Sequence, residues 1–132
     1  MDYHISLTAP SGTAQASALR STLSVPRGEI RRVRIWFPPG CAGLAYARVL
    51  IDEHQVYPSN LAAWYSGDGL LISFDDSLSL NQHTQTMALE VYNNDDTYPH
   101  TVSVGVTVWP EIKAAAPAGL PRWLSRLLRI GG

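Results

Sequence analysis

Residues 101–108 read TVSVGVTV, and this stretch decides the class of fold. Valine occupies every second position, and threonine, serine and glycine stand between the valines. Successive side chains of a β-strand point to opposite faces, so this alternation predicts a strand with one buried and one solvent-facing side. A helix would instead place apolar residues three or four positions apart.

The same alternation recurs along the chain, at residues 3–8, 19–25, 31–37, 45–51, 70–74 and 87–92. Turn formers separate these segments: PRG (26–28), PPG (38–40), YPSN (57–60), SGDG (66–69) and NNDD (93–96). Many short strands without intervening helical patterns are typical of antiparallel sandwiches. We therefore predict an all-β domain over residues 1–112, a two-sheet antiparallel β-sandwich with jelly-roll or Greek-key connections.

Composition narrows the class of protein. The 132 residues suffice for one domain with its own core, and only 16% of them are charged, which favours association with other subunits. The single cysteine, Cys41, excludes an internal disulfide framework and is expected to be a small buried hydrophobe. No apolar run follows Met1, so a secretory signal peptide is not expected.

The end of the chain has a different pattern. Residues 1–110 hold ten acids and six arginines, a net charge of −4, whereas residues 111–132 hold one acid and four bases, a net charge of +3. After a linker at residues 113–119, residues 120–130 are predicted to form a short amphipathic helix, because apolar residues recur at helical spacing. The apolar positions are Leu120, Trp123, Leu124, Leu127 and Leu128.

So short a helix is marginal alone in water, so we expect it to dock on another surface. Its expected partner-binding residues are Trp123, Leu124, Leu127 and Leu128, with Arg122, Arg126 and Arg129 meeting acidic groups. The sequence does not decide whether the helix docks on its own domain or on a neighbouring subunit. A membrane surface is the least favoured alternative.

The polar residues give no catalytic or metal-binding pattern. The four histidines are scattered, and the NNDDT stretch (93–97) is explained by an Asx turn as well as by calcium together with Asp68, Asp75 or Asp76. A metal-dependent hydrolase would need His54, His100 and the acids to converge in space. We therefore expect no enzyme activity, no metal and no cofactor.

Arginine and aromatic residues give two further candidate surfaces. Arg32, Arg34 and Trp36 are expected on one strand face, with the arginines paired to acids on neighbouring strands rather than to nucleic acid. Trp64, Tyr65 and Tyr57 lie near turns and are a candidate sugar-binding platform. Loop aromatics serve equally as protein–protein anchors.

Three stretches, FPPGCAGLAYARVLIDEHQVYPSN (37–60), WYSGDGLLISF (64–74) and LEVYNNDDTYPHTVSVGVTVWP (89–110), resemble small accessory structural proteins of tailed bacteriophages. These are capsid decoration (cement) proteins and small tail or neck components. The resemblance implies a non-enzymatic virion protein, assembled in the host cytoplasm. Its expected partners are a major capsid or tail protein or further copies of itself, in a homo-oligomer. The alternative prediction is a carbohydrate-binding β-sandwich module.

Overall fold

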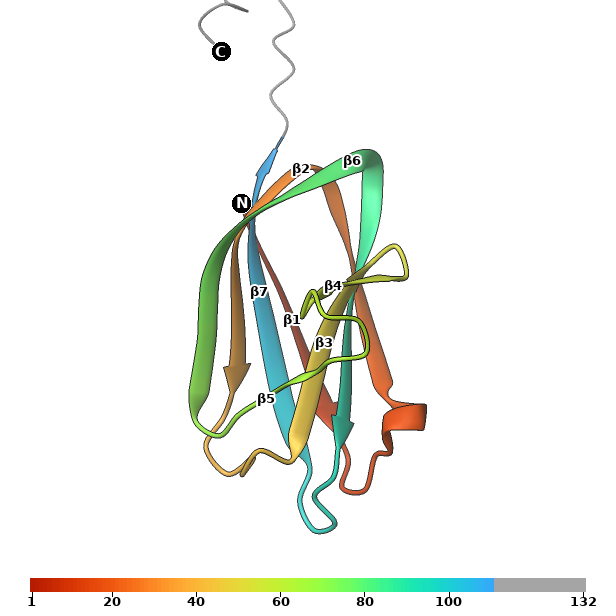
Figure 1. Ribbon diagram of the computed structural model, residues 1–132, viewed down its shortest axis with the longest axis vertical. Coiled ribbons are helices and arrows are strands. Elements are labelled where there is room, and N and C mark those ends of the chain that lie inside the picture. Colours follow the sequence, from red (N-terminus) through yellow and green to blue (C-terminus); the bar gives the residue numbers. More distant parts are fainter. Residues whose placement is uncertain (111–132) are drawn as a thin grey trace, which may run out of the picture.

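The computed structural model describes residues 1–110 of the chain (Figure 1). These residues form strands and one short 3-10 turn. The elements are β1 (Asp2–Ala9), η1 (Gln15–Ser17), β2 (Leu19–Phe37), β3 (Ala45–Ile51), β4 (His54–Tyr57), β5 (Tyr65–Ser66), β6 (Leu70–Asn93) and β7 (His100–Pro110). No helix among the described residues is long and apolar enough to cross a membrane.

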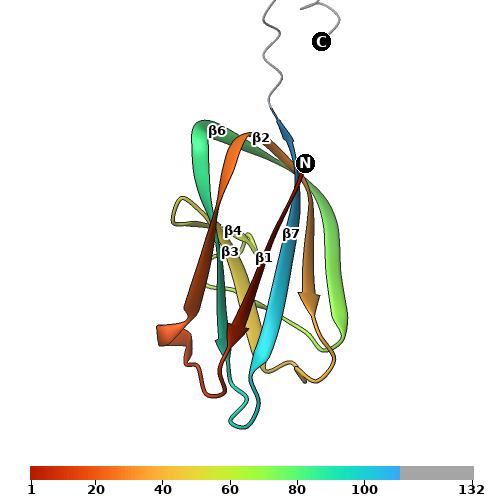
Figure 2. The same ribbon diagram turned by 180° about the vertical axis from the view of Figure 1, so that it is seen from behind.

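All strands belong to one antiparallel sheet with the order β1-β7-β2-β6-β3-β4, and β5 pairs with β3. The sheet folds over because β2 and β6 are long enough to run through two layers. Residues 19–26 of β2 pair with residues 84–91 of β6, whereas residues 28–37 pair with residues 70–80. Both strands bend at the same end of the molecule, here called the bend end (Figures 1 and 2).

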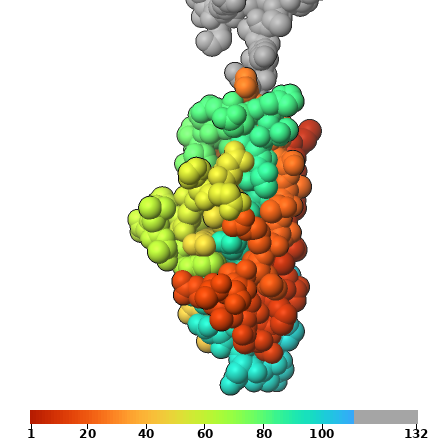
Figure 3. All heavy atoms as spheres, turned by 90° about the vertical axis from the view of Figure 1, so that its right-hand side faces the viewer, coloured from red at the N-terminus to blue at the C-terminus, as the bar shows by residue number. Residues whose placement is uncertain are grey.

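The two layers face each other as in a sandwich. The β7 layer consists of β1, β7, residues 28–37 of β2 and residues 70–80 of β6. The β3 layer consists of β3, β4, β5 and the remaining halves of the two long strands. At the bend end, the hairpin between β3 and β4 lies beside the bend of β6 (Figure 3).

The all-β and antiparallel predictions are confirmed, but the prediction of two separate sheets was wrong. Segments 19–25 and 31–37 are two halves of one strand, as are segments 70–74 and 87–92. The PRG stretch does not end β2, because its residues form a bulge, with register shifts between Pro26 and Gly28 and between Ile30 and Arg32. A bulge tolerates the missing N–H of proline and turns the strand into the other layer.

Within residues 1–110 there is no α-helix. The predicted linker (113–119) and the predicted helix (120–130), with its partner-binding residues, lie outside the described residues.

Alternation along the strands fills the space between the layers. The four valines of β7 are buried, as the sequence predicts, and they pack with inward residues of the long strands. The largest fully buried side chains of β2 and β6 include Phe37, Ile30, Ile35, Met87 and Leu89. Cys41 is also buried, and burial, with the nearby Asp68 carboxylate, raises the pKa of its thiol. It therefore behaves as a small hydrophobe.

Candidate functional site

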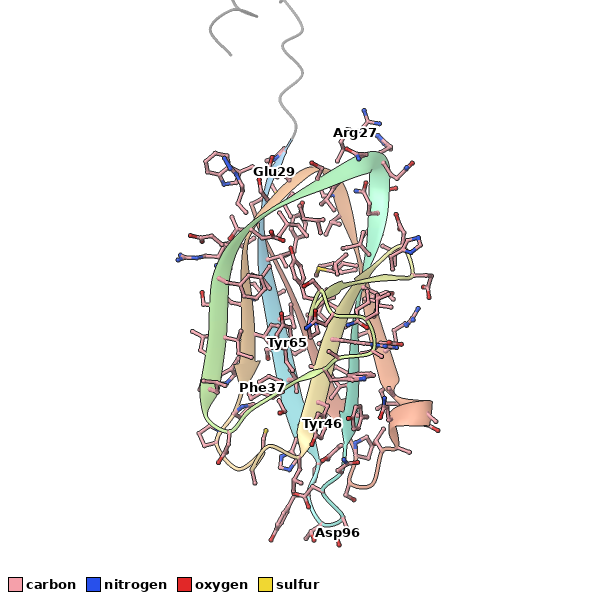
Figure 4. The ribbon with its side chains drawn as sticks, in the orientation of Figure 1. Arg27, Glu29, Phe37, Tyr46, Tyr65 and Asp96 are labelled. Atoms are coloured by element: carbon pink, nitrogen blue, oxygen red, sulfur yellow. The ribbon has the colours of Figure 1, made fainter. Side chains whose placement is uncertain are left out.

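Two of the three aromatic residues expected to form a sugar platform are turned toward the core. Tyr57 is only 5% exposed, its hydroxyl donates to the Asp76 carboxylate, and its ring meets Phe74 edge-on at 5.4 Å. Tyr65 packs against the core from β5, between the layers (Figure 4). Burial raises the pKa of both hydroxyls. Both tyrosines are therefore neutral packing residues.

Trp64 lies on the opposite side of the β3 layer, on its outer face. The Arg48 guanidinium covers the indole at 4.3 Å, and Tyr92 meets it edge-on at 4.7 Å. Tyr92 in turn stacks on Tyr46, with the ring centres 4.5 Å apart and the planes 7° from parallel. The structure thus separates Trp64 from Tyr57 and Tyr65, and the three do not form one surface.

A polar network holds the Trp64 segment against the sheet. Glu90 accepts from Arg20 (Nη2 to Oε2, 3.0 Å) and from Arg48 (Nε to Oε1, 2.7 Å). Arg48 also donates to Gln55 Oε1 at 3.2 Å. The Gln55 amide nitrogen then approaches three backbone carbonyl oxygens of the following loop within 3.1 Å, those of Pro58, Asn60 and Ala63. Trp64 and this network therefore fix a loop.

An exposed tryptophan that the sequence analysis did not assign to a sugar platform lies on the outer face of the β7 layer. Trp36 is 38% exposed, and the strand register places it in a row with Ser6, Ser103 and Leu71. The next row consists of His4, Gly105, Arg34 and Ser73, and the one after it of Asp2, Thr107, Arg32 and Asp75. These three rows are called the platform face.

Hydroxyl groups and paired charges surround Trp36 on this face. The hydroxyl oxygens of Ser6 and Ser103 are 2.9 Å apart. Arg34 reaches Thr107 Oγ1 at 3.4 Å and the Asp2 carboxylate at 3.6 Å, while Arg32 pairs with Asp75 at 3.3 Å. The cross-strand ion pairs expected for the two arginines are therefore present. The alternation in residues 31–37 already placed Trp36 on the solvent side, and this signal was sufficient to find it.

The histidines and acids do not converge. His54 begins β4 near the bend end, whereas His100 begins β7 at the opposite end (Figure 1). His100 bonds Asp95 at 2.8 Å, and Asp95 also accepts the backbone N–H of Thr97 at 2.8 Å. These bonds, with Thr97 contributing most, lower the pKa of Asp95. This is the Asx-stabilised turn that the sequence suggested.

The remaining candidate acids each have a separate partner. Asp75 pairs with Arg32 on the outer face, Asp76 accepts from Tyr57 on the inner side, and Asp68 accepts the N–H of Gly40 at 2.8 Å. In residues 1–110, no group of three or more His, Cys, Asp and Glu side chains is placed to hold a metal ion. The geometry that a metal-dependent hydrolase requires is not formed by these residues.

No protein-family model matches the chain, and no curated protein sequence matches it. Solved structures with a similar fold include the CBM36-1 domain of a multidomain xylanase from the hindgut metagenome of Trinervitermes trinervoides. It has 8% identity and a TM-score of 0.48, over 83% of this chain and 100% of that chain. A carbohydrate-binding module CBM36 in complex with calcium and xylotriose has 13% identity and a TM-score of 0.47, over 78% of this chain and 97% of that chain.

A chain of the cyanophage Pam1 capsid asymmetric unit has 15% identity and a TM-score of 0.46, over 84% of each chain. Carbohydrate-binding modules and a phage capsid chain thus occur together among the structures that resemble this one. At these identities the likeness concerns the type of β-fold and says nothing about the ligand.

Proposed function

We propose that this is a non-catalytic carbohydrate-binding domain that holds its glycan on the platform face. The observation that carries the proposal is the exposed indole of Trp36 in one row with the hydroxyl-bearing Ser6 and Ser103, on a sheet face backed by the core. The proposal adopts the alternative prediction made from the sequence, a carbohydrate-binding module, and moves its site from Trp64, Tyr65 and Tyr57 to Trp36.

The chemistry of the platform face suits a sugar ring. One side of a pyranose presents C–H groups, which pack well on an aromatic ring, and its edge presents hydroxyls that need donors and acceptors. Around Trp36, the hydroxyls of Ser6 and Ser103 supply both, and the Arg34 guanidinium supplies donors. The inward neighbours Val33 and Ile35 are fully buried, so the face is rigid before a ligand arrives.

The same geometry argues against glycoside hydrolysis on this face. Glycosidases hold two carboxyl groups about 5–9.5 Å apart. Here Asp2 and Asp75 stand at opposite ends of one row, three strand spacings apart, which is roughly 14 Å between backbones at ~4.8 Å per spacing. Each carboxylate is also held by its own arginine.

The test is affinity electrophoresis and a glycan array with the full chain, the Trp36→Ala variant and the Trp109→Ala variant. Trp109 is the matched control, because it is 57% exposed at the far end of β7. We expect Trp36→Ala to weaken glycan binding at least about tenfold, ~1.4 kcal/mol, and Trp109→Ala to leave it unchanged. Absence of any glycan binding, or equal losses in the two variants, would contradict the proposal.

A second candidate is a virion accessory protein that docks on neighbouring subunits, and one observation favours it. Leu71, the cross-strand neighbour of Trp36, is 52% exposed, and Leu70 beside it is also exposed. Apolar and aromatic side chains together are typical of protein–protein anchors. In this role the partner is a capsid or tail protein or another copy of this chain.

Light scattering after size exclusion separates the two candidates. If the chain is an assembly protein, Leu71→Ser will reduce its oligomeric state or its binding to the partner, and glycans will not compete. The same measurement on Trp123→Ala and Leu127→Ser tests the partner-binding residues predicted from the sequence. If the chain is a glycan-binding domain, Trp123→Ala and Leu127→Ser leave glycan affinity unchanged.

A further inference from the structure

A hollow of about 250 Å³ lies at the bend end, lined by residues of the β3–β4 hairpin and of the bend of β6. A second hollow of about 320 Å³ adjoins it and shares Ser79, Leu80 and Asn81. Arg27 lines the second hollow and lies at the opposite end of the molecule from Asp96 (Figure 4). None of the residues that form the platform face lines either hollow.

Both apolar and polar residues line the hollow. Ile51, Val56 and Leu80 supply apolar side chains from three parts of the sheet. Gln85 is 3% exposed and is fixed at both ends of its amide, since Nε2 donates to Val25 O at 3.2 Å and Oε1 accepts the N–H of Gln82. An amide nitrogen carries two protons, and the bond to Val25 uses one of them.

The β3–β4 hairpin, which also lines the hollow, is held in place by hydrogen bonds, as the Gln85 amide is. Asp52 and Glu53 form its two-residue turn with φ values of +47° and +69°, the left-handed pattern of a type I′ hairpin. Asp52 donates its N–H to Thr86 O at 3.0 Å, and its Oδ1 accepts the Thr86 N–H at 2.9 Å. Glu53 is paired with Arg20. The rim that carries Asp52 and His54 is therefore fixed before a ligand arrives.

These groups define a ligand. Among the lining residues, the Asp52 carboxylate can accept hydrogen bonds, the His54 imidazole can donate or accept, and the amides of Gln85 and Asn81 can donate, beside the apolar side chains of Ile51, Val56 and Leu80. The single carboxylate disfavours an anion. The volume lies below the ~300–1,000 Å³ of sites for drug-sized molecules, so the ligand is about one ring in size.

We propose that the bend-end hollow is a second subsite that binds one neutral, hydroxylated sugar ring, such as the terminal residue of a glycan. Its ligand class rests on the proposed function, but its residues are separate from the platform face. The open platform face then holds the interior of a glycan chain, and the hollow holds a chain end.

The experiment uses the full chain labelled with ¹⁵N, titrated with free glucose, galactose, mannose and xylose and with their methyl glycosides. The side-chain amide resonances of Gln85 and Asn81 report on the hollow, and the indole N–H of Trp36 reports on the platform face. We expect saturable shifts of the two amides with at least one sugar. Asp52→Asn and His54→Ala should each weaken that binding about three- to tenfold, the value of one hydrogen bond.

Each outcome decides one of the two sites. His54 is exposed, so loss of binding in His54→Ala with an unchanged spectrum elsewhere cannot be attributed to unfolding. If no sugar shifts the Gln85 amide, or if both variants bind as well as the original chain, the hollow is not a sugar site. The platform face is then judged separately by Trp36→Ala. If Trp36→Ala abolishes monosaccharide binding and the variants of the hollow do not, the sugar ring binds on the platform face. The subsite proposal then fails, and the proposed function stands.

Discussion

Replacing Glu90 with alanine tests whether burial decides the strength of the arginine network on the β3 layer. The Glu90 side chain is 11% exposed and accepts from both Arg20 and Arg48. Glu53 pairs with the same Arg20, but its side chain is 71% exposed. The two carboxylates thus share a partner and differ in solvent access, which makes Glu53→Ala a matched control.

The expected magnitudes follow from that difference. Breaking a fully buried ion pair costs ~3–5 kcal/mol, and an exposed pair contributes about 0–1 kcal/mol. Arg20 and Arg48 are themselves 33% and 27% exposed, so water screens part of the loss. We expect Glu90→Ala to lower the free energy of unfolding by about 2–3 kcal/mol and Glu53→Ala by less than ~1 kcal/mol.

Urea unfolding followed by circular dichroism measures both values, and thermal unfolding should show a Tm about 8–12 °C lower for Glu90→Ala. Salt provides a second readout. At 1 M salt the Debye length falls to ~3 Å, which should remove most of the Glu53 effect and little of the Glu90 effect. Equal losses for the two variants, or equal salt dependence, would refute the argument from burial.

Three further substitutions test other parts of the fold. Gly28→Ala should cost about 1–3 kcal/mol in urea unfolding, because a Cβ there would stand 2.3 Å from the Trp109 carbonyl oxygen and push β7 away. Hydrogen bonds from a backbone N–H and from His100 lower the pKa of Asp95. Its carboxylate therefore stabilises the fold above the unfolded pKa of ~3.9, and this contribution is lost as the pH falls through the lower folded pKa. The melting temperatures of the original chain and Asp95→Asn should differ at neutral pH and converge in acid. Trp64→Ala should lower the free energy of unfolding by about 2 kcal/mol, roughly half the loss for a core tryptophan, and leave glycan binding unchanged. A variant as stable as the original chain would contradict the packing role of this ring.

Period-two alternation predicted the strands and their buried faces well, because each strand has one face on the core. The valines of β7 are the clearest case. It did not predict that strands 19–25 and 31–37 are continuous, because Pro26 and Gly28 are turn formers in a local reading. Only the pairing with β6 on both sides of the bulge shows that the chain continues.

The candidate site was harder to predict than the fold. Trp64 and Trp36 both stand beside arginines in the structure, and nothing local to the sequence tells which ring a partner covers. Arg48 lies 16 positions before Trp64 and Tyr92 lies 28 positions after it, yet both pack on its ring. Trp36 has no such partner in its own row of the sheet face, which holds two serines and one leucine. Contacts between residues far apart in sequence therefore determine that the Trp64 ring is covered and the Trp36 ring is exposed.

The pairing of β1 with β7 sets the order of events during synthesis. Asp2 is opposite Thr107, so β1 gains its hydrogen-bonded partner only when β7, the last of the described strands, has been synthesised. Until then its edge hydrogen-bonding groups are open to other chains, which is a hazard for aggregation. Contacts between residues so far apart in sequence also slow folding, to milliseconds or longer in all-β proteins. A chain stalled before β7 is complete should therefore be a client of chaperones.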